Sequence, residues 1–318
     1  MLIRPAQRVY RTGVVDSTRW DRYRPRPDDI VISTYPKCGT TWMQRVVGLL
    51  VFQTPEPRPI MEISPWIDRR SATEPVAAVL AQLEAQAHRR FLKAHLPLDG
   101  LPLHDEVRYV HVARDGRDAC ISYHHHWSGL TAATLEALDR IGLEDETLGR
   151  LYPRAPADPA EHFHRWLTRG VIPGDEDGAP MMSFFHFERT WWEARHRPNV
   201  LLVHHGDLKA DLPGEMRRVA EFLGISVASD RWPALVAAAG FAAMRRDGDA
   251  LMGRVAASFE GGAGRFFHQG TNGRWRGLFR DEDLALYDAK IQATLSAACA
   301  RWIASGRLEA GDPRSTPG

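Results

Sequence analysis

The chain has 318 residues, of which 44% are hydrophobic and 25% charged, and its formal net charge is +1. This composition excludes wholesale disorder and allows a large buried core. The small net charge argues against a nucleic-acid binder or a general membrane-surface binder, since both usually carry a strong basic excess. Three widely spaced cysteines, no secretory leader and no apolar run of about 20 residues predict a cytoplasmic protein without stable membrane insertion.

Strand and helix signals alternate along most of the chain. Residues 1–29 are polar and arginine-rich and are expected to be irregular, and the tail at 306–318 is expected to fray. The glycine-rich segment 247–274 is expected to be a long loop. Predicted strands cover residues 30–32, 90–95, 107–113 and 199–204, and predicted helices cover residues 42–52, 75–90, 119–127, 133–140, 159–169, 181–197, 212–224 and 283–305, with short helices near 230–246.

This alternation predicts an α/β fold class. We expect a single domain over residues 30–305, with a central parallel sheet flanked by helices on both faces. Ligands of such folds bind where loops leave the carboxyl ends of the strands. Lys37, His95, Arg114 and His205 each follow a predicted strand. The sequence therefore predicts that these four side chains converge on one site.

The segment between the first strand and the first helix predicts an anion cradle. Lys37 precedes Gly39, which allows a tight turn, and Thr40 or Thr41 is expected to cap the helix that follows. Backbone N–H groups at a helix start attract anions, and the lysine adds a mobile positive charge. The order differs from the ATP-binding P-loop, in which the lysine follows the last glycine. We therefore do not expect ATP held in the usual way.

Several segments closely resemble motifs of the cytosolic sulfotransferase family, in family order from about residue 30 to residue 280. They are 34–42 (TYPKCGTTW), 93–97 (KAHLP), 112–118 (VARDGRD) with Ser122 and Tyr123, 205–209 (HGDLK), 222–224 (FLG) and 270–276 (GTNGRWR). The resemblance implies a P-loop-like sulfotransferase fold. It also implies transfer of a sulfonate group from 3′-phosphoadenosine 5′-phosphosulfate (PAPS) to a hydroxyl or amine, with 3′-phosphoadenosine 5′-phosphate (PAP) as product and no metal.

The resemblance also implies roles for individual residues. His95 is the expected base, and Lys37 and Lys93 are expected to meet the charge that develops on the leaving group. The residues expected to bind the nucleotide are Lys37, Cys38, Gly39, Thr40 and Thr41 at the 5′-phosphosulfate, Trp42, His205, Phe241 and Met244 at the adenine, and Arg114, Ser122, His268, Gln269 and Gly270 at the 3′-phosphate.

Three departures from the family pattern affect these expectations. His268 and Gln269 stand where the family has Arg and Lys, so the 3′-phosphate is held less tightly or Arg265 or Arg274 substitutes. Cys38 replaces a serine, and at a helix start beside a lysine we expect a lowered thiol pKa and sensitivity to oxidation. The family's dimer signature is not recognisable, so a homodimer stays open with no interface indicated.

The acceptor and two other functions stay open from the sequence. A P-loop-type nucleotide kinase is one alternative, and a non-catalytic nucleotide-binding protein is another. Apolar and aromatic residues in the poorly matching segments favour a small hydrophobic or lipid-like acceptor; they are Trp66, Trp127, Leu130, Leu251 and Phe259. His124, His125 and His126 do not predict a metal site, because consecutive helical side chains point about 100° apart.

Overall fold

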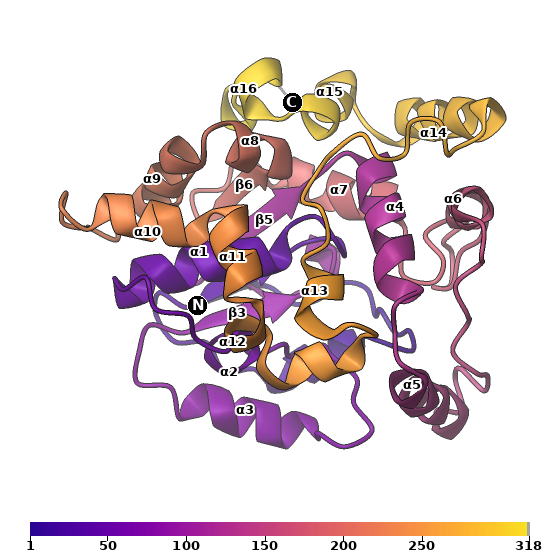
Figure 1. The fold of residues 1–318 in the computed structure, drawn as a ribbon, viewed down its shortest axis with the longest axis horizontal. Coiled ribbons are helices and arrows are strands. Elements are labelled where there is room, and N and C mark those ends of the chain that lie inside the picture. Colours follow the sequence, from indigo (N-terminus) through magenta and orange to yellow (C-terminus); the bar gives the residue numbers. More distant parts are fainter. Residues whose placement is uncertain (317–318) are drawn as a thin grey trace.

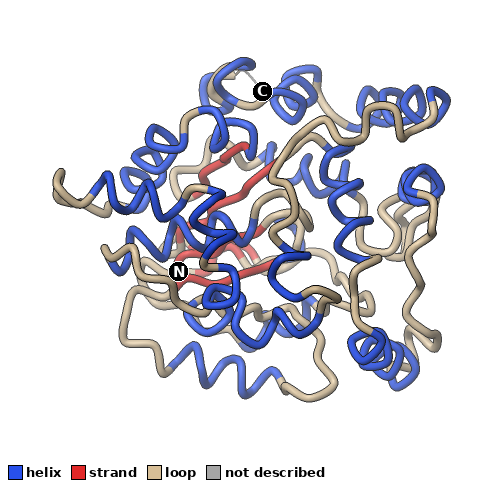
Figure 2. Tube along the Cα trace, in the orientation of Figure 1, coloured by secondary structure: helices blue, strands red, loops and turns tan. Residues whose placement is uncertain are grey.

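Four parallel strands form the centre of the protein, whose computed structural model describes residues 1–316. The strands are β2 (Ile30–Ser33), β3 (Phe91–Ala94), β5 (Arg108–Ala113) and β6 (Val200–His204), and their order across the sheet is β3-β2-β5-β6. Ile30 lies opposite both Phe91 and Arg108, so three strands begin at the same level. Figure 2 shows this sheet enclosed by helices, which confirms the predicted α/β fold.

Helices cover both faces of the sheet, and the strand residues alternate between them. One face carries Ile30, Val110 and Leu201 and packs on an aliphatic core from α1 (Thr40–Phe52), α9 (Leu212–Leu223) and α10 (Trp232–Ala239). The opposite face packs on a core rich in aromatic rings from α4 (Gly116–Trp127), α6 (Pro159–Thr168), α7 (Phe184–Glu193) and α14 (Asp281–Thr294). The two groups of helices lie on opposite sides of the strands in Figure 1.

The remaining helices and strands complete the fold. They are β1 (Leu2–Arg4) and β4 (Leu103–His104), the helices α2 (Ile60–Ile63), α3 (Val76–Glu84), α5 (Ala132–Glu144), α8 (His205–Ala210), α11 (Phe241–Arg246), α12 (Gly248–Met252), α13 (Gly262–Phe266), α15 (Ala297–Ser305) and α16 (Arg307–Ala310), and the 3₁₀ turns η1 (Ser17–Arg22), η2 (Leu98–Gly100), η3 (Gly253–Ser258) and η4 (Pro313–Ser315). The strands β1 and β4 pair antiparallel, apart from the main sheet.

Two predicted segments within residues 247–305 differ from the structure. The expected loop at 247–274 contains α12, η3 and α13, because Leu251, Phe259 and Phe267 are spaced to form a small core of their own. The expected helix at 283–305 is two helices, α14 and α15. The break falls where the Ser296 side chain accepts a hydrogen bond from the Cys299 N–H and so begins a new helix.

The two ends of the chain are more ordered than their composition suggests. Residues 1–29 contain β1 and η1, and Tyr10, Val15 and Trp20 are buried among core side chains. The described part of the expected frayed tail contains α16 and η4. A small number of buried apolar residues is therefore enough to order a segment that is rich in arginine.

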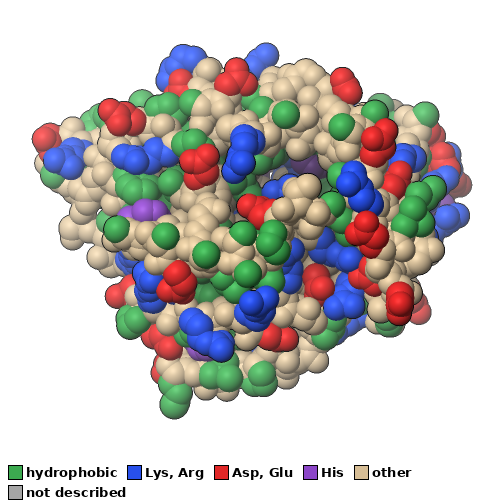
Figure 3. Space-filling model, turned by 90° about the horizontal axis from the view of Figure 1, so that it is seen from below, with side chains coloured by type: hydrophobic (Ala, Val, Ile, Leu, Met, Phe, Trp, Pro, Cys, Tyr) green, Lys and Arg blue, Asp and Glu red, His purple; other side chains and the backbone are tan. Residues whose placement is uncertain are grey.

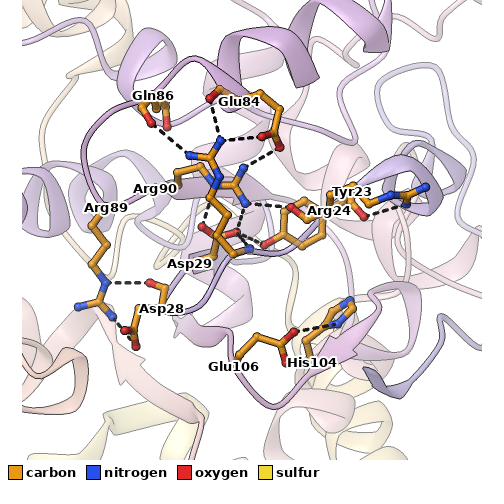
Figure 4. A network of polar contacts seen from close by, with 11 residues as sticks. Tyr23, Arg24, Asp28, Asp29, Glu84, Gln86, Arg89, Arg90, His104 and Glu106 are labelled. Atoms are coloured by element: carbon orange, nitrogen blue, oxygen red, sulfur yellow. Dashed lines mark hydrogen bonds and ion pairs between the residues drawn. The ribbon is translucent and has the colours of Figure 1, made fainter. Parts of the chain in front are cut away.

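A buried ionic network ties the N-terminal segment to the start of the sheet (Figure 4). The Arg90 guanidinium donates to both carboxylate oxygens of Asp29 and, over 2.8 Å, to Glu84. The Tyr23 hydroxyl donates to the same Asp29 carboxylate over 2.6 Å. Arg90 and Asp29 are 2% and 1% exposed, so this pair is part of the interior.

The surface seen in Figure 3 mixes acidic and basic side chains, with hydrophobic side chains between them. Large patches of one sign are not evident in this view, which agrees with the net charge of +1. Among residues 1–316, no helix is both long and apolar enough to cross a membrane.

Candidate functional site

The loop after β2 turns back on itself at two left-handed residues. Lys37 has φ +71° and Gly39 has φ +111°, and Gly39 is the N-cap of α1. A Cβ at Gly39 would lie 3.3 Å from the His205 ring, so the close approach also favours glycine. The predicted cap by Thr40 or Thr41 is therefore wrong. The Thr40 hydroxyl bonds instead to the Thr34 hydroxyl, inside the loop.

The residues that follow the four parallel strands meet at one edge of the sheet. His95, after β3, bonds through Nδ1 to the Thr34 carbonyl over 2.7 Å. Arg114, after β5, donates to the Lys37 carbonyl over 3.1 Å. His205, after β6, lies against Gly39. The loop that bears Lys37 is thus the point at which the other three converge, as the sequence predicted.

His95 is held in one tautomer. Because a carbonyl can only accept, Nδ1 carries the proton in the neutral ring and Nε2 is left with a free lone pair. The backbone N–H of His95 donates to the Asp68 carboxylate over 3.0 Å, and the Trp66 ring packs edge-on against the imidazole. Burial and the positive charge of Lys93 hold the pKa of His95 well below its ordinary value. The ring is therefore neutral at pH 7.

Lys37 and Lys93 are two ammonium groups with little compensation. Lys93 Nζ lies 3.9 Å above the Trp66 ring, and Lys37 Nζ lies 4.4 Å above the Phe266 ring of α13. Burial lowers the pKa of each lysine to about 7, helped at Lys37 by the charge of Arg114. Within residues 1–316, no carboxylate lies within 4.0 Å of either ammonium.

His126 on α4 is a site residue that the sequence reasoning missed. Its Nδ1 lies 3.5 Å from Lys37 Nζ, and its ring packs on Phe259 at 4.8 Å. The three consecutive histidines were considered only as metal ligands. The available signal was helical spacing, because His126 lies one turn after Ser122 on the face expected to meet the ligand.

Of the residues expected near an adenine, Trp42 and His205 are in contact with each other. Trp42 packs edge-on against His205 at 5.4 Å and donates from Nε1 to the Ala239 carbonyl over 2.8 Å. Phe241 is 38% exposed, and its ring touches Gly270, where a Cβ would lie only 2.7 Å from it. Met244 is 3% exposed and packs in the small core under α11 to α13.

The residues expected at the 3′-phosphate are only partly brought together. Arg114 donates to the Thr271 carbonyl and the Asn272 side chain, while its buried Nε has no partner. The Ser122 hydroxyl makes no hydrogen bond within the described chain, and Gln269 is exposed. His268 stacks on His125 at 4.0 Å.

Two arginines were considered as substitutes for the missing family charges. The Arg265 guanidinium is engaged by the His125 carbonyl and the Ser128 hydroxyl. The Arg274 guanidinium is half-buried and makes no hydrogen bond or ion pair within residues 1–316. Of the two, Arg274 is the one left available for an anion.

Cys38 contradicts the expectation of a reactive thiol. The side chain is fully buried in the aromatic-rich core. Burial raises the pKa of the thiol well above its ordinary value, and the charge of Arg114 does not offset it. The predicted sensitivity to oxidation is therefore wrong. The helix start was expected to lower the pKa of the thiol. Gly39 is the N-cap of α1, so Cys38 precedes the helix.

The three histidines of α4 lie among different partners. His124 bonds to the Pro156 carbonyl over 2.7 Å, His125 stacks on His268, and His126 faces Lys37. Within residues 1–316, no group of three or more His, Cys, Asp or Glu side chains is arranged to hold a metal ion.

Comparisons with known proteins identify the family of the chain. The sulfotransferase domain family matches residues 27–298. A glycolipid sulfotransferase of Mycobacterium bovis is 35% identical over 317 residues and covers 94% of each chain. Among solved structures, a mouse sulfotransferase complexed with PAP aligns with TM-score 0.65 at 19% identity over 90% of each chain, and retinol dehydratase in complex with retinol and PAP aligns with TM-score 0.66 at 22% identity over 89% and 87% of the two chains. The protein therefore belongs to the sulfotransferase family, and the kinase alternative is set aside.

Proposed function

We propose that this sulfotransferase transfers a sulfonate group from PAPS to a hydroxyl of a lipid-like acceptor, and that the acceptor class is glycolipid. The observation that carries the proposal is the free Nε2 of a neutral, fixed His95 in the same site as Lys37 and Lys93. The acceptor class is supported by the mycobacterial relatives, whose names describe glycolipid sulfotransferases.

The residues present suit a donor with several phosphate charges. Lys37, Lys93 and Arg114 gather at one end of the sheet, and the described chain offers no carboxylate within ion-pair distance of any of them. The buried Arg114 Nε without a partner is a donor that an anion can satisfy. Lys37 and Lys93 would lie at the 5′-phosphosulfate, and Arg114 with Arg274 at the 3′-phosphate.

PAPS, when bound, supplies the activated sulfonate and the phosphate leaving group. His95 Nε2 takes the proton of the acceptor hydroxyl as the new oxygen–sulfur bond forms. Lys37 and Lys93 stabilise the negative charge left on the 5′-phosphate oxygen as the old sulfur–oxygen bond breaks. Thr34 keeps His95 oriented through its carbonyl, so the free lone pair stays at Nε2.

The charges around the site also affect the pKa of His95. After burial, the charges of Lys93 and Lys37 help to lower the pKa of His95. A bound anion beside these lysines opposes their effect and raises the basicity of the imidazole. His95 therefore gains basicity when the donor is in place.

Aromatic side chains around the polar centre support an apolar acceptor. Trp66 packs on His95, and Phe259 and Phe266 pack on His126. Of these rings, Trp66 and Phe266 are only half-buried and can contact an acyl chain or a sugar face beside the hydroxyl that reacts, whereas Phe259 belongs to the small core. Two other residues considered for the acceptor have structural partners. Trp127 packs against Tyr152, and Leu251 lies in the small core.

The test is transfer of radiolabelled sulfonate from PAPS to a panel of glycolipids, steroids, phenols and amines. We expect the wild-type protein to label glycolipids best and His95→Ala to lose roughly a hundredfold to ten-thousandfold in rate. PAP binding should be retained in His95→Ala, which shows that the variant is folded. Wild-type transfer by His95→Ala would remove this residue as the base, and labelling of phenols alone would overturn the acceptor class.

A further inference from the structure

Lys37 has an unusual pair of partners. Its Nζ lies 3.5 Å from the His126 Nδ1 atom and 4.4 Å above the Phe266 ring. Across residues 1–316, His126 is the one polar side chain within hydrogen-bond distance of this ammonium. Since a desolvated ammonium without partners is costly, these two contacts are what hold it in the site.

The two partners are brought to Lys37 from distant parts of the chain. His126 lies in the last turn of α4, and Phe266 is the last residue of α13. Phe259 fixes the His126 ring from the side at 4.8 Å, and the Arg265 guanidinium ties α13 to α4 through the His125 carbonyl. The position of His126 is thus set by packing and does not depend on Lys37 itself.

The contact also fixes the proton of the imidazole. When Lys37 is protonated its ammonium can only donate, so His126 Nδ1 accepts and the ring proton lies on Nε2. Burial and the nearby charge of Lys37 keep the pKa of His126 well below its ordinary value. A neutral ring accepts from the lysine without repelling it.

We propose that His126 is a positioning residue for Lys37, whose Nδ1 lone pair holds the ammonium at the anion cradle in readiness for the donor. This inference rests on the proposed function. A carboxylate at the same place would neutralise the charge that the donor needs, whereas an imidazole lone pair and an aromatic face orient the ammonium and leave its charge available. A bound phosphate oxygen then completes the partners of Lys37.

Two near-isosteric substitutions separate this role from a packing role. The amide oxygen of His126→Asn can replace Nδ1, whereas the amide nitrogen of His126→Gln lies nearer to the position of Nε2. We expect Asn to keep kcat within about threefold of wild type and Gln to lose roughly ten- to a hundredfold, as for a lost bond to a charged group. His126→Phe keeps the ring packing on Phe259 and should behave as Gln does.

Binding of PAP, measured by calorimetry, is the readout that does not depend on turnover. The affinity should fall in His126→Gln and His126→Phe and stay near wild type in His126→Asn. His124→Asn and His124→Gln are the matched controls. His124 lies two residues earlier on α4 and bonds to the Pro156 carbonyl, so both variants should leave kcat and PAP affinity unchanged.

Equal values for His126→Asn and His126→Gln, or wild-type values for His126→Phe, would overturn the inference. If the Phe variant does not fold, the Asn and Gln pair still decides the question. Failure of the proposed function is distinguishable, since it would appear as a wild-type protein that binds PAP but transfers no sulfonate. In that case the PAP affinities of the variants still test the contact between His126 and Lys37.

Discussion

Two regions of this molecule bury positive charge in opposite ways. At the start of the sheet, Arg90 is enclosed by carboxylates from Asp29 and Glu84 and by the Arg24 carbonyl (Figure 4). At the other end of the strands, Lys37 and Lys93 face imidazole and aromatic rings. The same sheet thus holds an ion-paired cation at one edge and, at the other, two lysines without an ion-pair partner in the described chain, of which Lys93 is partly compensated by the charge of Asp68.

The difference shows in the pKa values. Burial is the largest single influence on the pKa of Arg90 and lowers it, but the hydrogen bonds and charges of Asp29 and Glu84 together outweigh burial and the pKa is raised. At Lys37 and Lys93 burial prevails, and the pKa falls to about 7. A cation that serves the fold is paired with carboxylates of the chain, whereas these lysines have no ion-pair partner within residues 1–316, which suits the binding of an anionic donor in the proposed function.

The largest effect is expected when the ion pair between Arg90 and Asp29 is broken. Arg90→Leu leaves the buried Asp29 carboxylate without its partner and should lower the free energy of unfolding by about 3–5 kcal/mol. Urea unfolding followed by circular dichroism measures this loss. The double variant Asp29→Leu/Arg90→Leu is the control and should recover part of it, because no unpaired charge remains. A single variant as stable as wild type would show that the network is not structural.

The opposite result is expected at the other edge of the sheet. Lys37→Met should lower kcat by roughly a hundredfold to a thousandfold, about 3–4 kcal/mol in the transition state. Its free energy of unfolding should be equal to or higher than that of wild type, since a poorly compensated buried charge is removed. Single-turnover sulfonate transfer and urea unfolding measure the two quantities. Marked destabilisation by Lys37→Met would contradict the comparison.

A smaller effect sharpens the comparison at the expected 3′-phosphate position. His268 stacks on His125, and its pKa is lowered by burial and by the charge of Arg274, so it is neutral at pH 7. His268→Arg adds a permanent charge and should tighten PAP binding about tenfold, or about 1.5 kcal/mol. Adenosine 5′-phosphate, which lacks the 3′-phosphate, should show no such gain. An equal gain in affinity for both nucleotides would show that residue 268 does not lie at the 3′-phosphate.

The smallest effect is expected at Cys38. Because the thiol is buried and its pKa is raised, a water-soluble thiol reagent should leave it unlabelled in the folded protein. Mass spectrometry after denaturation provides the comparison with the fully labelled chain. Cys38→Ala should retain activity within about twofold. Rapid labelling of Cys38 in the native protein would restore the redox hypothesis.

Much of the fold was predictable because its signals are local. The short apolar runs identify all four strands of the sheet, and the helix predicted at 212–224 is found as α9, which ends at the left-handed Gly224. The break between α14 and α15 was missed because Ser296 resembles an ordinary helical residue until its side chain caps the next helix. Likewise, three buried apolar residues turn the glycine-rich segment into short helices only through tertiary packing.

The candidate site was predictable where it follows strand ends and not where it depends on packing. Lys37, His95 and Arg114 were identified from their position after a strand. His126 was not, because its contact with Lys37 depends on the packing of α13 and Phe259 against α4. Cys38 was misjudged for a related reason, since sequence position beside a helix start does not show which side chain enters the core.

Proton uptake on PAP binding is the most direct test that the site holds uncompensated lysines. With pKa values of about 7, Lys37 and Lys93 are largely neutral at pH 8 in the free protein. A bound phosphate favours their charged forms and raises both pKa values, so binding takes up protons and the affinity falls as the pH rises above 7. Calorimetry at pH 8 in two buffers of different ionisation enthalpy measures the number of protons. The account predicts an uptake of one to two protons per PAP, reduced in Lys37→Met, whereas binding without proton uptake would contradict it.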